Sequence, residues 1–139
     1  MKVLIADDRL YMRAALRGYL ALHTSLEVCA EARDGVEAIT QARRHRPDLI
    51  LMDLAMPNIS GAEAALVVKN ILPEVRIILF TLYGDLAGQA VAKAAGIDCV
   101  LPKADGATGL TNALQMLLPQ QSLKKSNQVP APEEIAEMT

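Results

Sequence analysis

The most constraining stretch of this sequence is a run of four apolar residues, 49–52, that ends at a carboxylate, Asp53. A short run without any polar residue is typical of a strand buried on both faces, as in a parallel sheet. After a turn, Ser60 predicts the start of a helix, because Glu63 stands three residues later at capping-box spacing. We therefore expect Asp53 at the carboxyl end of a central strand, the edge where open α/β sheets bind ligands.

Strand patterns and helix patterns alternate along the rest of the chain. The other strands are expected over residues 2–6, 27–31, 75–80 and 98–101. Helices are expected between them and after the last one, and the final helix ends before Pro119. Alternation of this kind predicts the α/β class, with a parallel sheet covered by helices on both faces.

Several local expectations follow from helix and strand periodicity. Asp34 and Asp105 are expected to cap the second and the fifth helix. Arg13 is expected on a solvated face of the first helix, away from its apolar stripe. Val28 and Ala30 are expected on one face of the second strand, which lies near the sheet edge.

Length and composition fit one domain with an aliphatic core. The chain has 139 residues, of which aromatic residues make up 3%, and its net charge is −2. This charge gives no general attraction to nucleic acid, and no apolar run is long enough to cross a membrane. Cys29 and Cys99 have no metal-ligand spacing and are expected as reduced thiols in a cytoplasmic protein. We expect the domain to cover residues 1–119, followed by a poorly ordered polar tail over 120–139.

Polar residues with complementary chemistry stand at the ends of four predicted strands. They are Asp7, Asp8, Asp53, Thr81 and Lys103. Because parallel strands bring their carboxyl ends to one edge, these side chains are expected to meet there. Neighbouring carboxylates repel one another unless a cation joins them, and Mg²⁺ prefers oxygen ligands. Each residue alone has an ordinary structural explanation, such as a turn or a helix cap for Asp53. Together they indicate a phosphoryl-accepting site with Asp53 as nucleophile.

The chain resembles the bacterial two-component response-regulator receiver domain over residues 2–118. The matching elements are the acid pair Asp7-Asp8, the segment 52–57 with Gly61, Thr81 and Lys103. The sequence at 34–35, 46–48 and 94–96 is most similar to that of receivers of the NarL/LuxR type. The resemblance implies the flavodoxin-like receiver fold, a doubly wound five-stranded parallel sheet in the order 2-1-3-4-5.

The resemblance also implies roles for individual residues. Asp8, Asp53 and the backbone carbonyl of Ala55 would bind Mg²⁺, and Asp7 would help through a water molecule. Asp53 would accept a phosphoryl group from a histidine kinase or a histidine phosphotransfer protein, assisted by Thr81 and Lys103. Phosphorylation would then switch a partner-binding surface of the domain. The domain itself would bind neither nucleic acid nor membrane. Whether it forms a homodimer is left undecided by the resemblance. The chain could be the receiver part of a transcription regulator.

One departure from the family pattern, and the residues at two positions that tune phosphate loss, bear on the expected switching. Val100 stands where the family usually has an aromatic residue, so coupling is expected to run through Thr81 and the loop 82–85. Ala55 and Tyr83 occupy the positions that tune self-hydrolysis in the family, and they predict only slow loss of phosphate.

Two alternatives compete with a signalling receiver that is not an enzyme. A haloacid-dehalogenase-like phosphatase also uses an aspartate nucleophile and Mg²⁺, but it needs an Asp-x-Asp motif, and Asp7-Asp8 lacks that spacing. A degenerate receiver that serves only for docking would not need all five polar residues.

Overall fold

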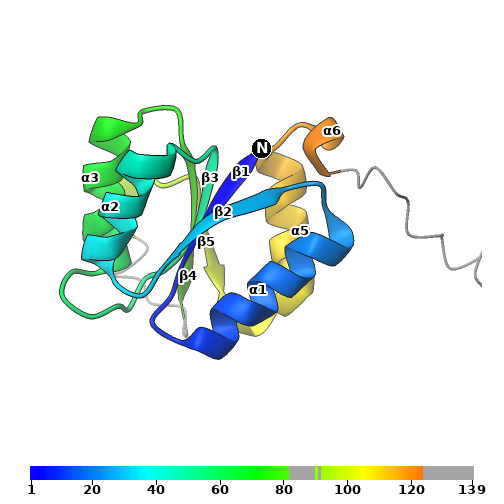
Figure 1. Cartoon of the computed structure of the whole chain (residues 1–139), viewed down its shortest axis with the longest axis horizontal. Coiled ribbons are helices and arrows are strands. Elements are labelled where there is room, and N and C mark those ends of the chain that lie inside the picture. The colour runs from blue at the N-terminus through cyan, green and yellow to red at the C-terminus, as the bar shows by residue number, and fades with distance from the viewer. Residues whose placement is uncertain (82–89, 91, 124–139) are drawn as a thin grey trace, which may run out of the picture.

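The computed structural model describes residues 1–81, 90 and 92–123. Five parallel strands form one sheet in the order β2-β1-β3-β4-β5 (Figure 1). The strands are β1 (Lys2–Ala6), β2 (Glu27–Ala32), β3 (Leu49–Asp53), β4 (Arg76–Thr81) and β5 (Cys99–Pro102). The predicted fold class and strand order are therefore confirmed.

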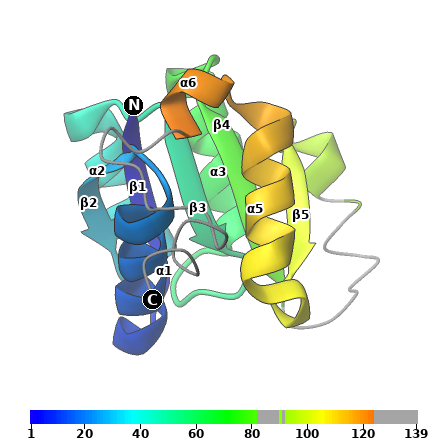
Figure 2. The ribbon, with the colours of Figure 1, turned by 90° about the vertical axis from the view of Figure 1, so that its right-hand side faces the viewer.

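Helices cover both faces of the sheet. One layer contains α2 (Gly35–His45) and α3 (Gly61–Ile71), and the opposite layer contains α1 (Leu10–His23) and α5 (Gly106–Leu117) (Figures 1 and 2). Residues 90 and 92–94, between β4 and β5, are also helical. The Ser60 side chain accepts a hydrogen bond from the Glu63 backbone N–H at 3.2 Å, as the capping-box spacing predicts.

The core is divided by the sheet into two aliphatic clusters. Strand β3 is buried along its whole length. Its alternate residues Ile50 and Met52 join the cluster under α2 and α3, whereas Leu49 and Leu51 join the cluster under α1 and α5. A strand with no exposed face holds its register firmly, because a slip of one residue would exchange the two sets. Such a strand gives Asp53 a fixed position.

A β-bulge corrects the expected pattern of the second strand. Val28 pairs with Val3 and Ala30 pairs with Leu4, so β2 contains one extra residue at this point. Val28 consequently packs with the α1–α5 cluster, and Ala30 packs with the α2–α3 cluster. The prediction that both lie on one face is wrong, because sequence alternation alone does not reveal an inserted residue.

The entry to α5 also differs from expectation. A 3-10 turn, η1 (Lys103–Asp105), precedes the helix, and Asp105 has helical backbone angles with no side-chain cap hydrogen bond. The prediction that Asp105 caps this helix is therefore wrong. Asp34, in contrast, accepts a hydrogen bond from the Glu37 backbone N–H at 2.7 Å and caps α2 as predicted.

The described chain continues past residue 119 into a short helix, α6 (Gln120–Leu123). Leu123 packs against the α1–α5 cluster, and the Ser25 hydroxyl donates a hydrogen bond to the Ser122 carbonyl at 2.6 Å. These four residues, assigned from the sequence to the tail, thus belong to the folded part. The remainder of the expected tail lies outside the described residues.

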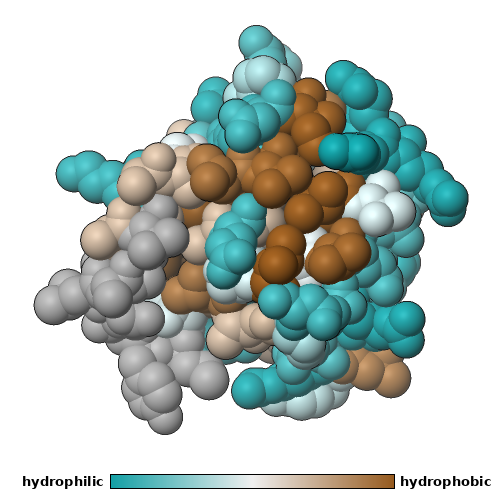
Figure 3. Space-filling view, turned by 90° about the vertical axis from the view of Figure 1, so that its left-hand side faces the viewer, coloured by the Kyte–Doolittle hydropathy of each residue, from teal (hydrophilic) through white to brown (hydrophobic). Residues whose placement is uncertain are grey.

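The outer face of α2 and α3 carries exposed apolar side chains, which gather near the centre of Figure 3. Val36 and Leu66 are about half exposed, and Val67 is exposed as well. Within the described ranges, no helix combines the length and the apolar character needed to cross a bilayer.

Candidate functional site

Strand register brings the polar residues of the sequence pattern to the carboxyl edge of the sheet. The aligned pairs at this edge are Ala6–Met52, Asp53–Phe80 and Thr81–Pro102. Asp7 therefore follows β1 beside Asp53, and Thr81 lies one residue beyond the Asp53 register on the next strand. Lys103 directly follows β5. The edge thus assembles residues that are far apart in sequence.

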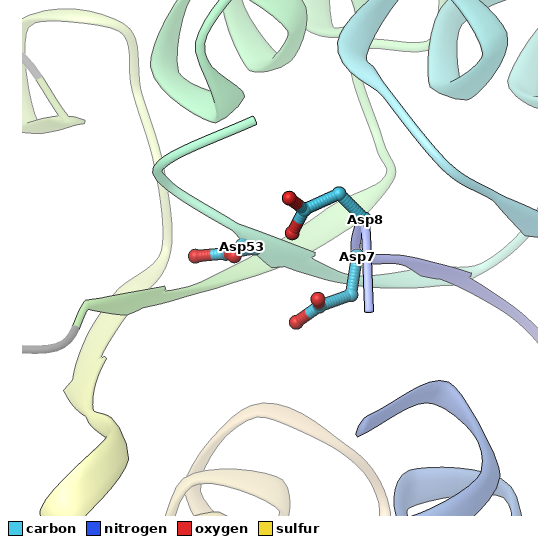
Figure 4. A group of neighbouring side chains, drawn as sticks. All are labelled: Asp7, Asp8 and Asp53. Carbon is cyan, nitrogen blue, oxygen red and sulfur yellow. The ribbon is translucent and has the colours of Figure 1, made fainter. Parts of the chain in front are cut away.

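The carboxylates of Asp7, Asp8 and Asp53 form one group (Figure 4). One oxygen from each lies within 4.8 Å of the others. Asp7 and Asp53 are almost completely buried, whereas Asp8 is exposed. The group thus has two fixed members inside the domain and one member that faces solvent.

Among the described residues, Lys103 is the cation whose ammonium group contacts these carboxylates. Its Nζ lies 3.3 Å from Asp53 Oδ2 and 3.6 Å from Asp7 Oδ2, and its side chain is only 10% exposed. The position between two buried carboxylates offsets part of their repulsion. One ammonium beside three carboxylates still leaves the site with excess negative charge.

Burial makes the charged form of Asp7 unfavourable. Desolvation is the largest influence on its pKa and raises it. The backbone N–H of Arg9, which donates to Asp7 Oδ1 at 2.9 Å, acts in the opposite direction, and the nearby Asp53 carboxylate raises the pKa again. The net effect is a raised pKa, as expected where a cationic ligand would relieve the cost of a buried carboxylate.

The loop after Asp53 is held close to the sheet. The Ala55 backbone N–H donates to Asp53 Oδ1 at 3.2 Å, and the Gly61 N–H donates to the Leu54 carbonyl at 2.8 Å. A Cβ atom at Gly61 would overlap the Asp53 carbonyl oxygen. Only glycine therefore lets the start of α3 approach the backbone of Asp53 this closely.

The position of Arg13 differs from the expectation, and its side chain contacts the backbone of the acidic loop. It is buried, not solvated, with 9% of its surface exposed. Its Nη1 donates to the Asp7 backbone carbonyl at 2.7 Å, and its Nε donates to Glu31 Oε1 at 3.0 Å. Arg17 binds the other oxygen of Glu31 at 2.6 Å. We call Arg13, Glu31 and Arg17 the Glu31 cluster.

Sequence reasoning did not assign a role to Arg13 or Glu31. Helical periodicity classes arginine as polar and does not register that its long side chain can reach a neighbouring strand. Two features of the sequence could have indicated this contact. Arg13 stands five residues after Asp8, in the first turn of α1, and Glu31 is an acidic residue on the edge strand β2. These features need the strand order before they can be used.

The donor set fits a hard divalent cation. Asp7, Asp8 and Asp53 supply only oxygen ligands, and the cluster contains no histidine or cysteine. All-oxygen sites with exposed positions for water suit Mg²⁺ better than metals that prefer nitrogen or sulfur. The raised pKa of Asp7 and the excess of carboxylates over ammonium groups agree with this choice.

Comparison with known proteins identifies the family. The family model described as "Response regulator receiver domain" matches residues 3–115. This chain belongs to the response-regulator receiver family. Members of this family are signalling domains that bind Mg²⁺ at an acidic site and interact with histidine kinases or phosphotransfer proteins. The match leaves the dehalogenase-like alternative without support.

The relatives indicate a receiver of the NarL/LuxR type. Response regulator protein VraR of Staphylococcus aureus strain Mu3 is 34% identical over 115 residues, which are 83% of this chain and 55% of VraR. The chain thus spans about half the length of the curated relatives it matches. A LuxR-family response regulator from Aurantimonas sp. SI85-9A1 superposes with a TM-score of 0.79 at 27% identity, covering 99% of this chain and 96% of that one.

The fold is also shared with a chemotaxis receiver. Chemotaxis protein CheY4 of Vibrio cholerae is 30% identical, with a TM-score of 0.75 over 84% of this chain and 98% of that one.

Proposed function

We propose that this receiver accepts a phosphoryl group on Asp53 in an Mg²⁺-dependent reaction. The observation that carries the proposal is the buried Asp53 carboxylate with Asp7, Asp8 and Lys103 gathered around it. Asp53 ends β3, a strand that is buried throughout and pairs with β1 and β4 on its two sides, so its carboxylate is positioned before any donor arrives. Positioning and charge neutralisation are what phosphoryl transfer chiefly requires.

The proposed metal ligands are Asp8, Asp53 and the backbone carbonyl of Ala55, with Asp7 acting through water. The exposed Asp8 can rearrange to meet an entering ion, whereas the buried Asp7 is already fixed. The ion would neutralise charge on the transferring phosphoryl oxygens and on the carboxylates that surround them. This assignment explains why a domain keeps a buried carboxylate with a raised pKa.

The chain's own residues would divide the remaining work. One Asp53 oxygen forms a bond to phosphorus while the bond from phosphorus to the donor, a phosphohistidine nitrogen or an acyl oxygen, breaks. Lys103, already 3.3 Å from Asp53 Oδ2, would move from the carboxylate to a phosphoryl oxygen. Thr81, buried at the end of β4, would donate its hydroxyl to another. Both contacts stabilise charge that develops during transfer.

We further propose that the phosphoryl donor is a histidine kinase or a histidine phosphotransfer protein, and that the output runs through the helix after β4, β5 and α5. In that surface Lys93 and Gln115 are exposed and Thr111 is half-buried. Tyr83 and the loop 82–85, expected to tune self-hydrolysis and to transmit the switch, lie outside the described residues. A longer protein with this receiver, comparable in length to its curated relatives, would act in transcription regulation.

Intact-mass spectrometry after incubation with acetyl phosphate tests the proposal. We expect one added phosphoryl group in the presence of Mg²⁺ and none after chelation. The Asp53→Asn variant, which keeps the shape of the side chain but removes the nucleophile, should stay unlabelled. Equal labelling of this variant, or labelling that a chelator leaves unchanged, would overturn the assignment.

A further inference from the structure

The two acids that follow β1 are joined by a single peptide plane, and hydrogen bonds hold both this plane and the one before it. In the preceding Ala6–Asp7 plane, the Asp7 backbone N–H donates to the Ala32 carbonyl at 3.0 Å. The Asp7 carbonyl accepts from Arg13 Nη1 at 2.7 Å in a buried contact. Because the peptide unit is planar, fixing the Asp7 carbonyl also fixes the Asp8 nitrogen and limits the direction of the Asp8 side chain.

We propose that Arg13 is a positioning residue that sets the geometry of the Asp7–Asp8 carboxylates for a divalent cation. The inference rests on the proposed Mg²⁺ site and adds to it a residue that does not touch the ion. Arg13 reaches the peptide plane from α1, so it connects the orientation of this helix with that of the acidic loop.

The guanidinium can do this because it is itself fixed. Arg13 Nε donates to Glu31 Oε1 at 3.0 Å, and the second Glu31 oxygen is taken by Arg17. A planar fork that binds a carboxylate with one nitrogen and a carbonyl with another has little remaining freedom. Burial alone would raise the pKa of Glu31, but hydrogen bonds from Arg17 and Arg13 outweigh it and lower that pKa, so Glu31 stays charged and keeps its hold on Arg13.

Charge and geometry predict opposite effects of removing Arg13. Taking a cation away from the neighbourhood of three carboxylates would by Coulomb's law strengthen Mg²⁺ binding. Releasing the Asp7–Asp8 peptide plane would weaken it, because the ligands must then be ordered when the ion binds. A weakened affinity therefore identifies positioning and cannot come from lost charge.

The test compares Arg13→Met with Arg17→Met by calorimetric Mg²⁺ titration of the whole chain, with folding verified by circular dichroism. Both variants lose one cation that binds Glu31, but among the described contacts only Arg13 also reaches Asp7. We expect the Mg²⁺ Kd to rise about tenfold in Arg13→Met, as is usual for the partners of metal ligands. In Arg17→Met it should stay within about twofold of wild type, because this side chain is half exposed.

Two further variants keep the result decisive. Arg13→Lys retains the charge without the fork and should also bind Mg²⁺ weakly, since one ammonium cannot reproduce both contacts. Glu31→Gln leaves Arg13 in place but weakens the interaction that orients its guanidinium. If Arg13→Met does not fold, this variant provides the test, and we expect its Mg²⁺ Kd to rise by less than tenfold. Wild-type affinity in Arg13→Lys or in a folded Arg13→Met would overturn the inference. Absence of Mg²⁺ binding by the wild type would instead refute the proposed function.

Discussion

Two ion clusters of the same charge arrangement, a carboxylate between two cations, lie at opposite edges of the sheet. At the carboxyl edge the Glu31 cluster connects α1 with β2. At the amino edge Asp98 binds Lys69 at 3.0 Å and Arg76 at 3.4 Å, and its Oδ2 also accepts the Ile77 backbone N–H at 2.8 Å. We call Lys69, Asp98 and Arg76 the Asp98 cluster. The Glu31 cluster contacts the acidic loop of the site through Arg13, whereas the Asp98 cluster contacts the backbone of β4 through Asp98.

This difference separates stability from function. The Asp98 cluster joins α3, the start of β4 and the residue before β5, so its loss should loosen the fold without affecting the carboxylates. The Glu31 cluster contributes to stability and also, through Arg13, to the orientation of Asp7. The same arrangement of charges in two places is thus expected to give different effects on Mg²⁺ binding.

The largest expected effect on stability belongs to Asp98→Ala. The change leaves the Ile77 N–H without its acceptor and takes the carboxylate partner from a mostly buried Lys69, so the free energy of unfolding should fall by about 3 kcal/mol. Urea denaturation measures the loss. Asp98→Asn should lose less, because an amide oxygen can still accept from Ile77. If either folded variant changes the Mg²⁺ Kd as strongly as Arg13→Met, the proposed difference between the Asp98 cluster and the Glu31 cluster is wrong.

Glu31→Gln should cost about 1.5 kcal/mol of unfolding free energy at neutral pH, because charge-assisted hydrogen bonds become neutral ones. Since the folded-state pKa of Glu31 is lowered from its ordinary value of 4.5, the extra stability of the wild type is fully present above that value. It should be lost as the pH falls through the lower folded-state pKa.

Urea denaturation over a pH series checks this dependence. Glu37→Gln is the control, because the Arg33–Glu37 pair is exposed and its loss should change stability by less than about 0.5 kcal/mol. A difference between wild type and Glu31→Gln that persists unchanged at acidic pH would speak against a charged Glu31 as its cause.

Asp7→Asn should stabilise the metal-free protein by about 1 kcal/mol, because it removes a carboxylate whose burial is unfavourable. The raised pKa of Asp7 gives the sign: its charged form is less stable in the folded chain than in the unfolded one, so neutral pH carries a cost. Urea denaturation in the presence of a chelator measures the gain. The exposed Asp8→Asn is the matched control and should change little. Destabilisation by Asp7→Asn would contradict a strained carboxylate at this position.

The smallest effect is expected from Gly18→Ala, one residue after Arg17 in α1. Nothing lies within 4 Å of the added Cβ, so the helix should gain about 0.5 kcal/mol. Combined with Arg13→Met, it should return part of the lost stability and none of the lost Mg²⁺ affinity. Thermal denaturation and calorimetry on the double variant provide the check. Recovered affinity would mean that helix stability, not the contact with Asp7, sets Mg²⁺ binding.

The sequence was sufficient for the sheet and for the residues at its edge. An uninterrupted apolar run predicted β3, and the alternation of strands and helices predicted that the strands are parallel. Both inferences depend on short-range sequence patterns. The position of Asp53 followed from where that run ends. The strand order itself came from the family resemblance, since several orders satisfy the same alternation.

The errors share a physical cause, namely interactions that depend on geometry between elements. Arg13 was expected in solvent because helical periodicity does not register a contact with Glu31 on another strand. The bulge in β2 and the 3-10 turn before α5 each shift a residue relative to the regular pattern. That shift displaced Ala30 from its expected face and Asp105 from its expected cap.

The most direct test of the account is to name the residue that carries the phosphoryl group. Borohydride reduces the acyl phosphate of an aspartate to homoserine, so tandem mass spectrometry of the reduced peptides locates it. After treatment with acetyl phosphate and Mg²⁺ we expect homoserine at position 53, and none when Mg²⁺ is chelated. Homoserine at Asp7 or Asp8, or at position 53 without Mg²⁺, would contradict the account.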